Sequence, residues 1–72
     1  MREGLIRARH KAGFTQVEAA EGAEISRRHY QGLEAGSRNA SYQVWRRIAD
    51  LFDTSVEAIT ETESQRIMRS GL

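Results

Sequence analysis

The segment from Thr15 to Gly36, TQVEAAEGAEISRRHYQGLEAG, constrains the fold of this chain more than any other part of it. Thr15 and Ser26 are residues that favour helix starts, and each precedes a run of helix-forming residues, while Gly36 stands where the second run stops. Glu18 completes a capping box with Thr15, in which hydroxyl and carboxylate each bond a backbone N–H at the helix start. We therefore predict two short helices joined by a tight turn.

The turn between these helices is expected around Gly22 to Glu24. A left-handed conformation at Glu24 would cost on the order of 1 kcal/mol relative to Gly. Either the turn has another shape or Gly22 takes the strained position. Ile25 follows the turn and is expected to pack inward.

Apolar residues at helical spacing continue on both sides of this segment, and the chain has no proline. A first helix is expected from Arg2 to Ala12, because Gly13 stands where a helix would stop. Ser41 can cap a fourth helix from Tyr42 to Phe52, which has the broadest apolar face in the chain. Ser55 can cap a short fifth helix, so the sequence predicts an all-α fold.

The length of 72 residues allows one domain. We expect a compact five-helix domain over residues 1–60, followed by a tail or short helix over residues 61–72 that could make a dimer contact. The absence of Cys excludes disulfides and thiolate metal sites. No run is long and apolar enough for a membrane span or signal peptide, so we expect no membrane partner and a cytoplasmic location.

The charge of the chain is asymmetric although its net value is only +1. Residues 1–47 carry nine Lys and Arg against five Glu, whereas residues 48–72 carry two Arg against five Asp and Glu. Such a distribution suits a basic surface for nucleic acid opposite an acidic one. An ordinary solvated surface can have a similar composition, so charge alone favours DNA only weakly.

Several short motifs occur in order at the expected helix boundaries. They are Gly13-Phe14-Thr15-Gln16, Ala20, Ile25-Ser26-Arg27-Arg28, Leu33-Glu34-Ala35-Gly36, Ile48-Ala49-Asp50-Leu51-Phe52 and Ser55-Val56. With these motifs, the run from Leu5 to Ile59 resembles the Xre/Cro-type helix-turn-helix family of phage repressors and restriction-modification controller proteins. The resemblance implies a lambda-repressor-like fold and a transcriptional regulator, a repressor or controller protein, that binds double-stranded DNA.

The second helix of the motif carries the residues expected to read bases. Arg27 and Arg28 lie in its first turn, and an arginine fork can bond O6 and N7 of guanine together. One of the two could instead contact only phosphate. Gln31, one turn further on, can bond an adenine or a backbone oxygen.

The DNA backbone is expected to be contacted from both sides of this helix. The resemblance implies a phosphate contact for Gln16 at the start of the preceding helix, and the donors of the loop before the fourth helix suit the same task. The predicted phosphate contacts are Gln16, Ser26, His29, Arg38, Asn39 and Ser41. Capping, packing or plain solvation remain alternatives for them. The resemblance also implies that Glu34 pairs with a nearby arginine, with plain solvation as the alternative.

Other functions find less support in the sequence. His10 and His29 have no acidic neighbours at ligand spacing, so no metal or cofactor is expected. The chain has no Cys nucleophile and no glycine-rich phosphate loop, so we do not expect an enzyme. Tyr30 and Trp45 are interpreted as core residues rather than base-stacking ones.

A homodimer on a pseudo-palindromic operator is expected, because one short recognition helix buries too little surface to be specific. The predicted interface residues are Val56, Ile59, Ile67 and Met68. The alternative is an antitoxin-like or co-regulator module whose main partner is another protein, bound by the acidic last third of the chain.

Overall fold

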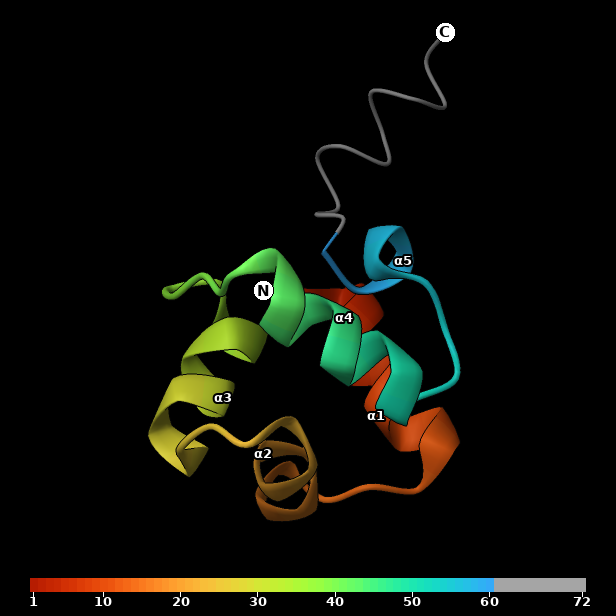
Figure 1. The fold of residues 1–72 in the computed structure, drawn as a ribbon, viewed down its shortest axis with the longest axis horizontal. Coiled ribbons are helices and arrows are strands. Elements are labelled where there is room, and N and C mark those ends of the chain that lie inside the picture. Colours follow the sequence, from red (N-terminus) through yellow and green to blue (C-terminus); the bar gives the residue numbers. More distant parts are fainter. Residues whose placement is uncertain (61–72) are drawn as a thin grey trace, which may run out of the picture.

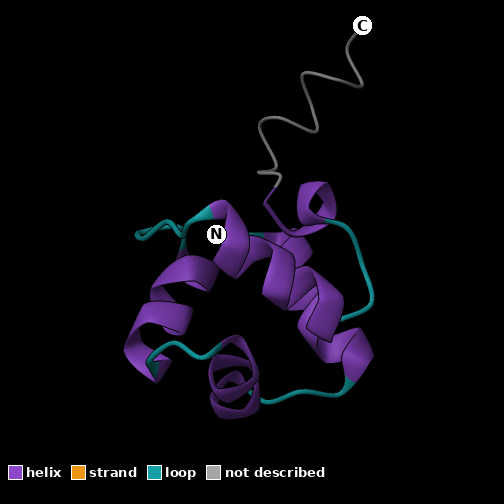
Figure 2. Ribbon diagram, viewed as in Figure 1, coloured by secondary structure: helices purple, strands orange, loops and turns teal. Residues whose placement is uncertain are grey.

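The computed structural model describes residues 1–60, which form five helices joined by short loops (Figure 1). The helices are α1 (Glu3–Ala12), α2 (Gln16–Ala23), α3 (Arg27–Ala35), α4 (Tyr42–Leu51) and α5 (Val56–Thr60). In Figure 1, α2 and α3 lie on one side of the molecule and α5 on the other, with α1 and α4 between them. Figure 2 shows no strand in the described part of the chain, and the predicted all-α fold is confirmed.

The helix starts follow the capping residues seen in the sequence. The hydroxyl of Thr15 accepts a bond from the backbone N–H of Glu18 at 3.1 Å, and the carboxylate of Glu18 accepts the N–H of Thr15 at 2.9 Å. Ser26 and Ser41 each accept a bond from the backbone N–H three residues further on, at 3.0 and 3.3 Å. The predicted caps of α2, α3 and α4 are therefore confirmed, and each satisfies an otherwise unpaired donor of its helix.

α1, α2 and α3 each end at a residue with a left-handed backbone conformation. Gly13 and Gly36 have φ of 79° and 85°, as expected for glycines that stop a helix. The turn between α2 and α3 places Glu24 itself in this region, at φ 59° and ψ 40°. Gly22 lies within α2 instead, where a Cβ would stand 2.6 Å from the side chain of Leu51. Gly22 thus serves the close approach of α4, and the strain of the turn falls on Glu24.

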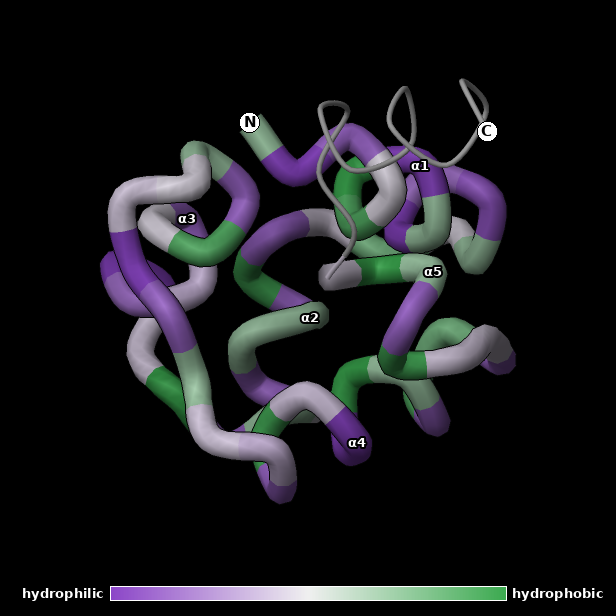
Figure 3. Tube along the Cα trace, turned by 90° about the horizontal axis from the view of Figure 1, so that it is seen from above, coloured by the Kyte–Doolittle hydropathy of each residue, from purple (hydrophilic) through white to green (hydrophobic). Residues whose placement is uncertain are grey.

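The core is built from all five helices. Five large side chains are completely buried in it: Leu5, Tyr30, Leu33, Ile48 and Ile59. α1 packs against α3 and α5, α2 against α3 and α4, and α4 against α5. Figure 3 shows apolar and polar residues alternating along the helices, as expected where each helix buries one face.

Aromatic side chains complete the core. Trp45 is 5% exposed and Tyr30 is fully buried, so their predicted placement in the core is confirmed. Phe14 and Phe52 meet edge to face, with ring centroids 5.4 Å apart. Three buried alanines of α2, Ala19, Ala20 and Ala23, keep that helix close to its neighbours.

α1 and α5 approach each other closely at a glycine. A Cβ on Gly4 would collide with the backbone carbonyl oxygen of Ala58. Any larger residue at this position would push α5 outward. The glycine of α1 is therefore required by the position of the fifth helix.

Candidate nucleic-acid interface

α3 turns one face into the core and the other to solvent. Tyr30 and Leu33 are buried, whereas Arg27, Arg28 and Gln31 are exposed. Within residues 1–60 neither arginine makes an ion pair with a carboxylate. Their guanidinium donors are therefore available to an external acceptor, and the two side chains diverge by about 100° around the helix.

A buried polar network lies on the inner face of α3. Its centre is Glu34, whose carboxylate accepts bonds from Arg9 Nε at 2.6 Å, Tyr30 Oη at 2.7 Å and Gln16 Nε2 at 2.9 Å. The Glu34 side chain is 5% exposed and that of Arg9 is 11% exposed. The expected pairing of Glu34 with an arginine is confirmed, and the partner comes from α1.

The network fixes the protonation of its members. Burial alone would raise the pKa of the Glu34 carboxyl, but hydrogen bonds from Arg9, Gln16 and Tyr30 outweigh it and hold that pKa below its usual value. Burial, together with the neighbouring carboxylate, raises the pKa of Tyr30. The structure therefore contains a buried ion pair whose remaining acceptor sites are filled by Tyr30 and Gln16. Within the described residues, no buried side-chain nitrogen or oxygen lacks a hydrogen-bond partner.

Gln16 connects this network to the exposed face of α3. Its amide nitrogen donates one hydrogen to Glu34 and has a second for an outside acceptor, while its oxygen accepts a bond from Gln31 Nε2 at 3.3 Å. The order of contacts is thus Arg9, Glu34, Gln16 and Gln31. A buried charge pair sets the orientation of one predicted phosphate contact and, through it, of one predicted base contact.

The other predicted phosphate contacts gather on the start of α3 and on the loop from Ser37 to Ser41. Arg38, Asn39 and Ser41 are exposed there, with Ser26 at the start of α3. Ser26 and Ser41 use their hydroxyl oxygens as caps, but each hydroxyl hydrogen remains free to donate.

Two further contacts hold this loop against α3. The ring Nε2 of His29 lies 3.1 Å from the carbonyl oxygen of Asn39, and because a carbonyl only accepts, Nε2 carries the hydrogen. The aliphatic part of Arg38 covers Gly32, where a Cβ would stand 2.6 Å from the arginine side chain. Gly32 therefore gives the loop room to lie on the recognition helix, and His29 is occupied in holding the loop in place.

One predicted interface residue is corrected by the structure. Ile59 is completely buried in the core of the monomer, so it offers no surface to a second copy. Its spacing from Val56 marked an apolar face of α5, but that face packs inward against α1 and α4. Val56 is half-buried, and Ile67 and Met68 lie outside the described residues.

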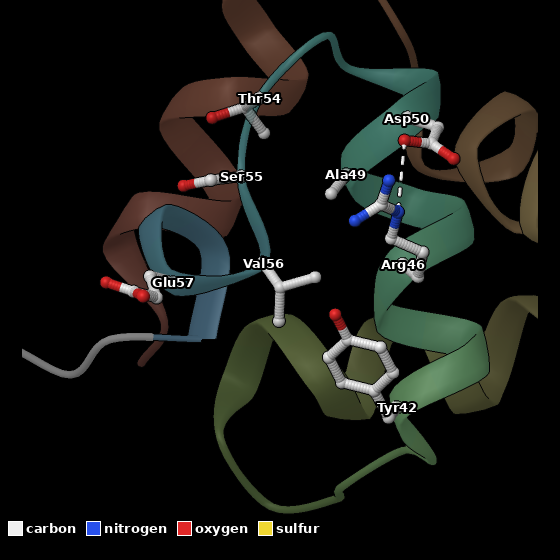
Figure 4. Close-up of a pocket in the computed structure, with 8 residues that line it drawn as sticks. All are labelled: Tyr42, Arg46, Ala49, Asp50, Thr54, Ser55, Val56 and Glu57. Carbon is white, nitrogen blue, oxygen red and sulfur yellow. Dashed lines mark ion pairs between the residues drawn. The ribbon is translucent and has the colours of Figure 1, made fainter.

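A groove between α4 and α5 contains the exposed part of Val56. It has a volume of about 430 Å³. In Figure 4, Tyr42 of α4 and Val56 of α5 face one another across it, and Arg46 pairs with Asp50 at 3.5 Å along one wall. Tyr42 is 67% exposed.

Arg2 is a residue that the sequence reasoning missed. Its guanidinium bonds the carbonyl oxygens of Leu33 and Arg38, which lie 31 and 36 residues further along the chain. Before α1, such an arginine looks like an ordinary solvated charge. No local signal could have identified its role, because its partners are placed by the fold alone.

Residues 1–60 lack two features that other classes of site would need. No group of three or more His, Asp or Glu residues could hold a metal ion in that range. None of the helices described there is both long and apolar enough to cross a membrane.

Comparison with known proteins agrees with this geometry. Residues 4–61 match the family model of the helix-turn-helix domain. The chain is 40% identical over 50 residues to the uncharacterized HTH-type transcriptional regulator YqaF of Bacillus subtilis (strain 168), an alignment that spans 69% of this chain and 66% of that protein. The matched part is thus just under two thirds of the relative's length. No solved structure gives a significant match. The family model covers α1 to α5 almost completely, and the chain belongs to the helix-turn-helix domain family.

Proposed function

We propose that this protein is a sequence-specific, DNA-binding transcriptional regulator of the Xre/Cro type, which inserts α3 into the major groove. The exposed face of α3 is the observation that carries the proposal. It offers two exposed arginines and a glutamine, while its opposite face is fixed in the core. Such a regulator acts on DNA in the cytoplasm.

The chemistry of the exposed side chains suits base recognition. Arg27 and Arg28 supply forked donors for O6 and N7 of guanine, and Gln31 can bond an adenine through both its amide atoms. Each good bidentate pair discriminates against a wrong base by about 1–3 kcal/mol. Because Gln31 already bonds Gln16, its amide would enter the groove with a limited set of orientations.

The surrounding donors suit contacts to the DNA backbone. Gln16 contacts Gln31 of α3, and the loop from Ser37 to Ser41 contacts His29 and Gly32 of the same helix. The proposed phosphate contacts are Gln16, Ser26, Arg38, Asn39 and Ser41, and His29 supports them by bonding the carbonyl oxygen of Asn39. Contacts of this kind hold a recognition helix in register without reading sequence.

The test begins with selection of bound sequences from a random pool of duplex DNA. Arg28→Ala should then relax base preference at one position of the selected site, whereas Arg38→Ala should weaken all sequences about equally. Arg7→Ala, an exposed residue of α1, is the matched control for loss of one positive charge. If both Arg28→Ala and Arg38→Ala bind the selected site like the parent, the proposed DNA face is wrong.

Salt dependence separates DNA from a protein partner. Release of counterions makes affinity for DNA fall steeply between 50 and 200 mM salt. An affinity for DNA that does not change with salt, together with a stoichiometric protein in the purified material, would instead support the antitoxin-like or co-regulator function.

A homodimer would bring two copies of α3 to successive major grooves, about 34 Å apart. We propose the groove between α4 and α5 as its contact surface, with Val56 as the contact from α5. The support is an exposed Tyr42 beside Arg46 and Asp50, because opposite charges on one patch can pair across a two-fold axis.

The dimer is tested by sedimentation of Val56→Asp and of Tyr42→Ala against the parent. Either change should shift the protein in solution toward the mass of a monomer. The DNA sites selected by the variant should lose their two-fold symmetry. A parent that sediments as a monomer on a site without two-fold symmetry would refute the dimer and leave the DNA face intact.

A further inference from the structure

The loop that precedes α4 is tied to the first residues of the chain. Arg2 donates from one guanidinium nitrogen to the carbonyl oxygen of Leu33 at 2.7 Å and to that of Arg38 at 2.8 Å. The backbone N–H of Arg2 also bonds the carbonyl oxygen of Glu34 at 2.9 Å. These contacts connect the end of α3 with the loop after it, so one residue bridges both.

The same guanidinium covers the indole ring of Trp45, with its central carbon 5.0 Å from the ring centroid. The indole Nε1 in turn donates to the side-chain oxygen of Asn39 at 3.2 Å. That oxygen also accepts the backbone N–H of Ala40 at 2.9 Å. Asn39 is therefore held from one side by the ring that Arg2 covers.

The other anchors of the loop come from α3 and from Trp45. Arg38 and Asn39 are both exposed, and the loop's other contacts run to Gly32 and His29 on α3. Arg2 bonds the carbonyl oxygen of Arg38, and the side chain of Arg38 lies along Gly32. Charge-assisted hydrogen bonds of this kind are about twice as strong as neutral ones.

We propose that Arg2 is a positioning residue for DNA binding, which holds the loop from Ser37 to Ser41 so that Arg38 and Asn39 meet the phosphate backbone. This inference depends on the proposed DNA-binding function. One guanidinium nitrogen of Arg2 bonds both protein carbonyls, and through these bonds Arg2 acts on the loop.

The test is a double-mutant cycle on the selected operator. Arg2→Met should weaken binding roughly tenfold and reduce the salt slope by about 1, because the phosphate contact of Arg38 is lost. Combined with Arg38→Ala, its loss should be clearly less than additive. Arg7→Met, an exposed arginine of the adjoining helix α1, is the control for loss of one positive charge. Additive losses, or equal effects of Arg2→Met and Arg7→Met, would overturn the inference.

Two further readouts separate positioning from general stability. Trp45 is the single tryptophan of the chain, so its emission in the free protein should shift to the red in Arg2→Met as the ring loses its cover. Arg2→Lys keeps a cation near both carbonyls and should restore much of the affinity. An unchanged emission, or Arg2→Lys no better than Arg2→Met, would contradict the role assigned to this residue. If the parent itself selects no DNA site, the proposed function fails before this inference is reached.

Discussion

The ion pair between Arg9 and Glu34 should contribute far more to stability than its surface counterparts. Removing one partner of a buried pair leaves an unpaired charge and costs about 3–5 kcal/mol. At about 0.05–0.15 kcal/mol per residue, a domain of this size has about 4–11 kcal/mol in total. Arg9→Met should therefore remove a large share of the free energy of unfolding.

The assay is urea unfolding followed by Trp45 fluorescence. With a slope of about 1 kcal/mol per molar urea, a loss of about 3 kcal/mol lowers the midpoint by about 3 M. Arg46→Met is the matched control, because its pair with Asp50 is exposed, at 63% and 68%, and should contribute below about 0.5 kcal/mol.

A second variant tests the physical reason. Arg9→Met combined with Glu34→Leu leaves no buried charge, so it should recover part of the loss. The recovery is incomplete because the hydroxyl of Tyr30 then lacks its acceptor, which costs about 1–3 kcal/mol. Adding Tyr30→Phe should regain that amount. If Arg9→Met shifts the midpoint no more than Arg46→Met, the buried pair does not hold the domain together and the reasoning is wrong.

Three further outcomes are expected. Gly4→Ala should lower the melting temperature by several degrees, because its Cβ meets the backbone at Ala58. Gly22→Ala should lower it less, because its Cβ meets only the flexible end of a leucine side chain. Equal melting temperatures for the two variants would contradict the packing of α1 on α5. Glu24→Gly should raise the free energy of unfolding by up to about 1 kcal/mol, since Gly adopts positive φ without strain. Urea unfolding measures this change, and a lower free energy of unfolding in the variant would refute the prediction. Because the pKa of Glu34 is lowered in the folded protein, its ionised carboxylate stabilises the fold above the ordinary pKa of about 4.3, and this stabilisation is lost as pH falls through the lower, folded value. Below about pH 4.5 the melting temperature should therefore drop more steeply in the parent than in Glu34→Gln. Parallel profiles of the two proteins would contradict this prediction.

Local features of the sequence predicted the helices well. Thr15, Ser26 and Ser41 bond donors only three residues away, so the cap and its partner are visible in one short stretch. Gly36 likewise ends its helix by its own backbone conformation. Five helices and the exposed position of Arg27 could therefore be predicted from spacing and capping alone.

Contacts between distant segments could not be predicted in this way. The burial of Ile59 depends on where α5 packs, and the sequence shows only that one face of α5 is apolar. Arg9 and Arg2 look alike in the sequence, yet one pairs with a buried carboxylate and the other bonds two carbonyls. Their roles follow from three-dimensional neighbours, which no spacing rule identifies.

The packing of α1 on α5 also determines when this domain can finish folding. The two helices are separated by more than 40 residues of chain. Because α1 is synthesised before α5, we expect the contact between the two helices to form only after α5 has left the ribosome. In the folded protein this five-residue helix is the shortest of the five, and Ile59 is its buried side chain. Amide hydrogens of α5 should consequently exchange faster than those of α4, so we expect local unfolding of the domain to begin at α5.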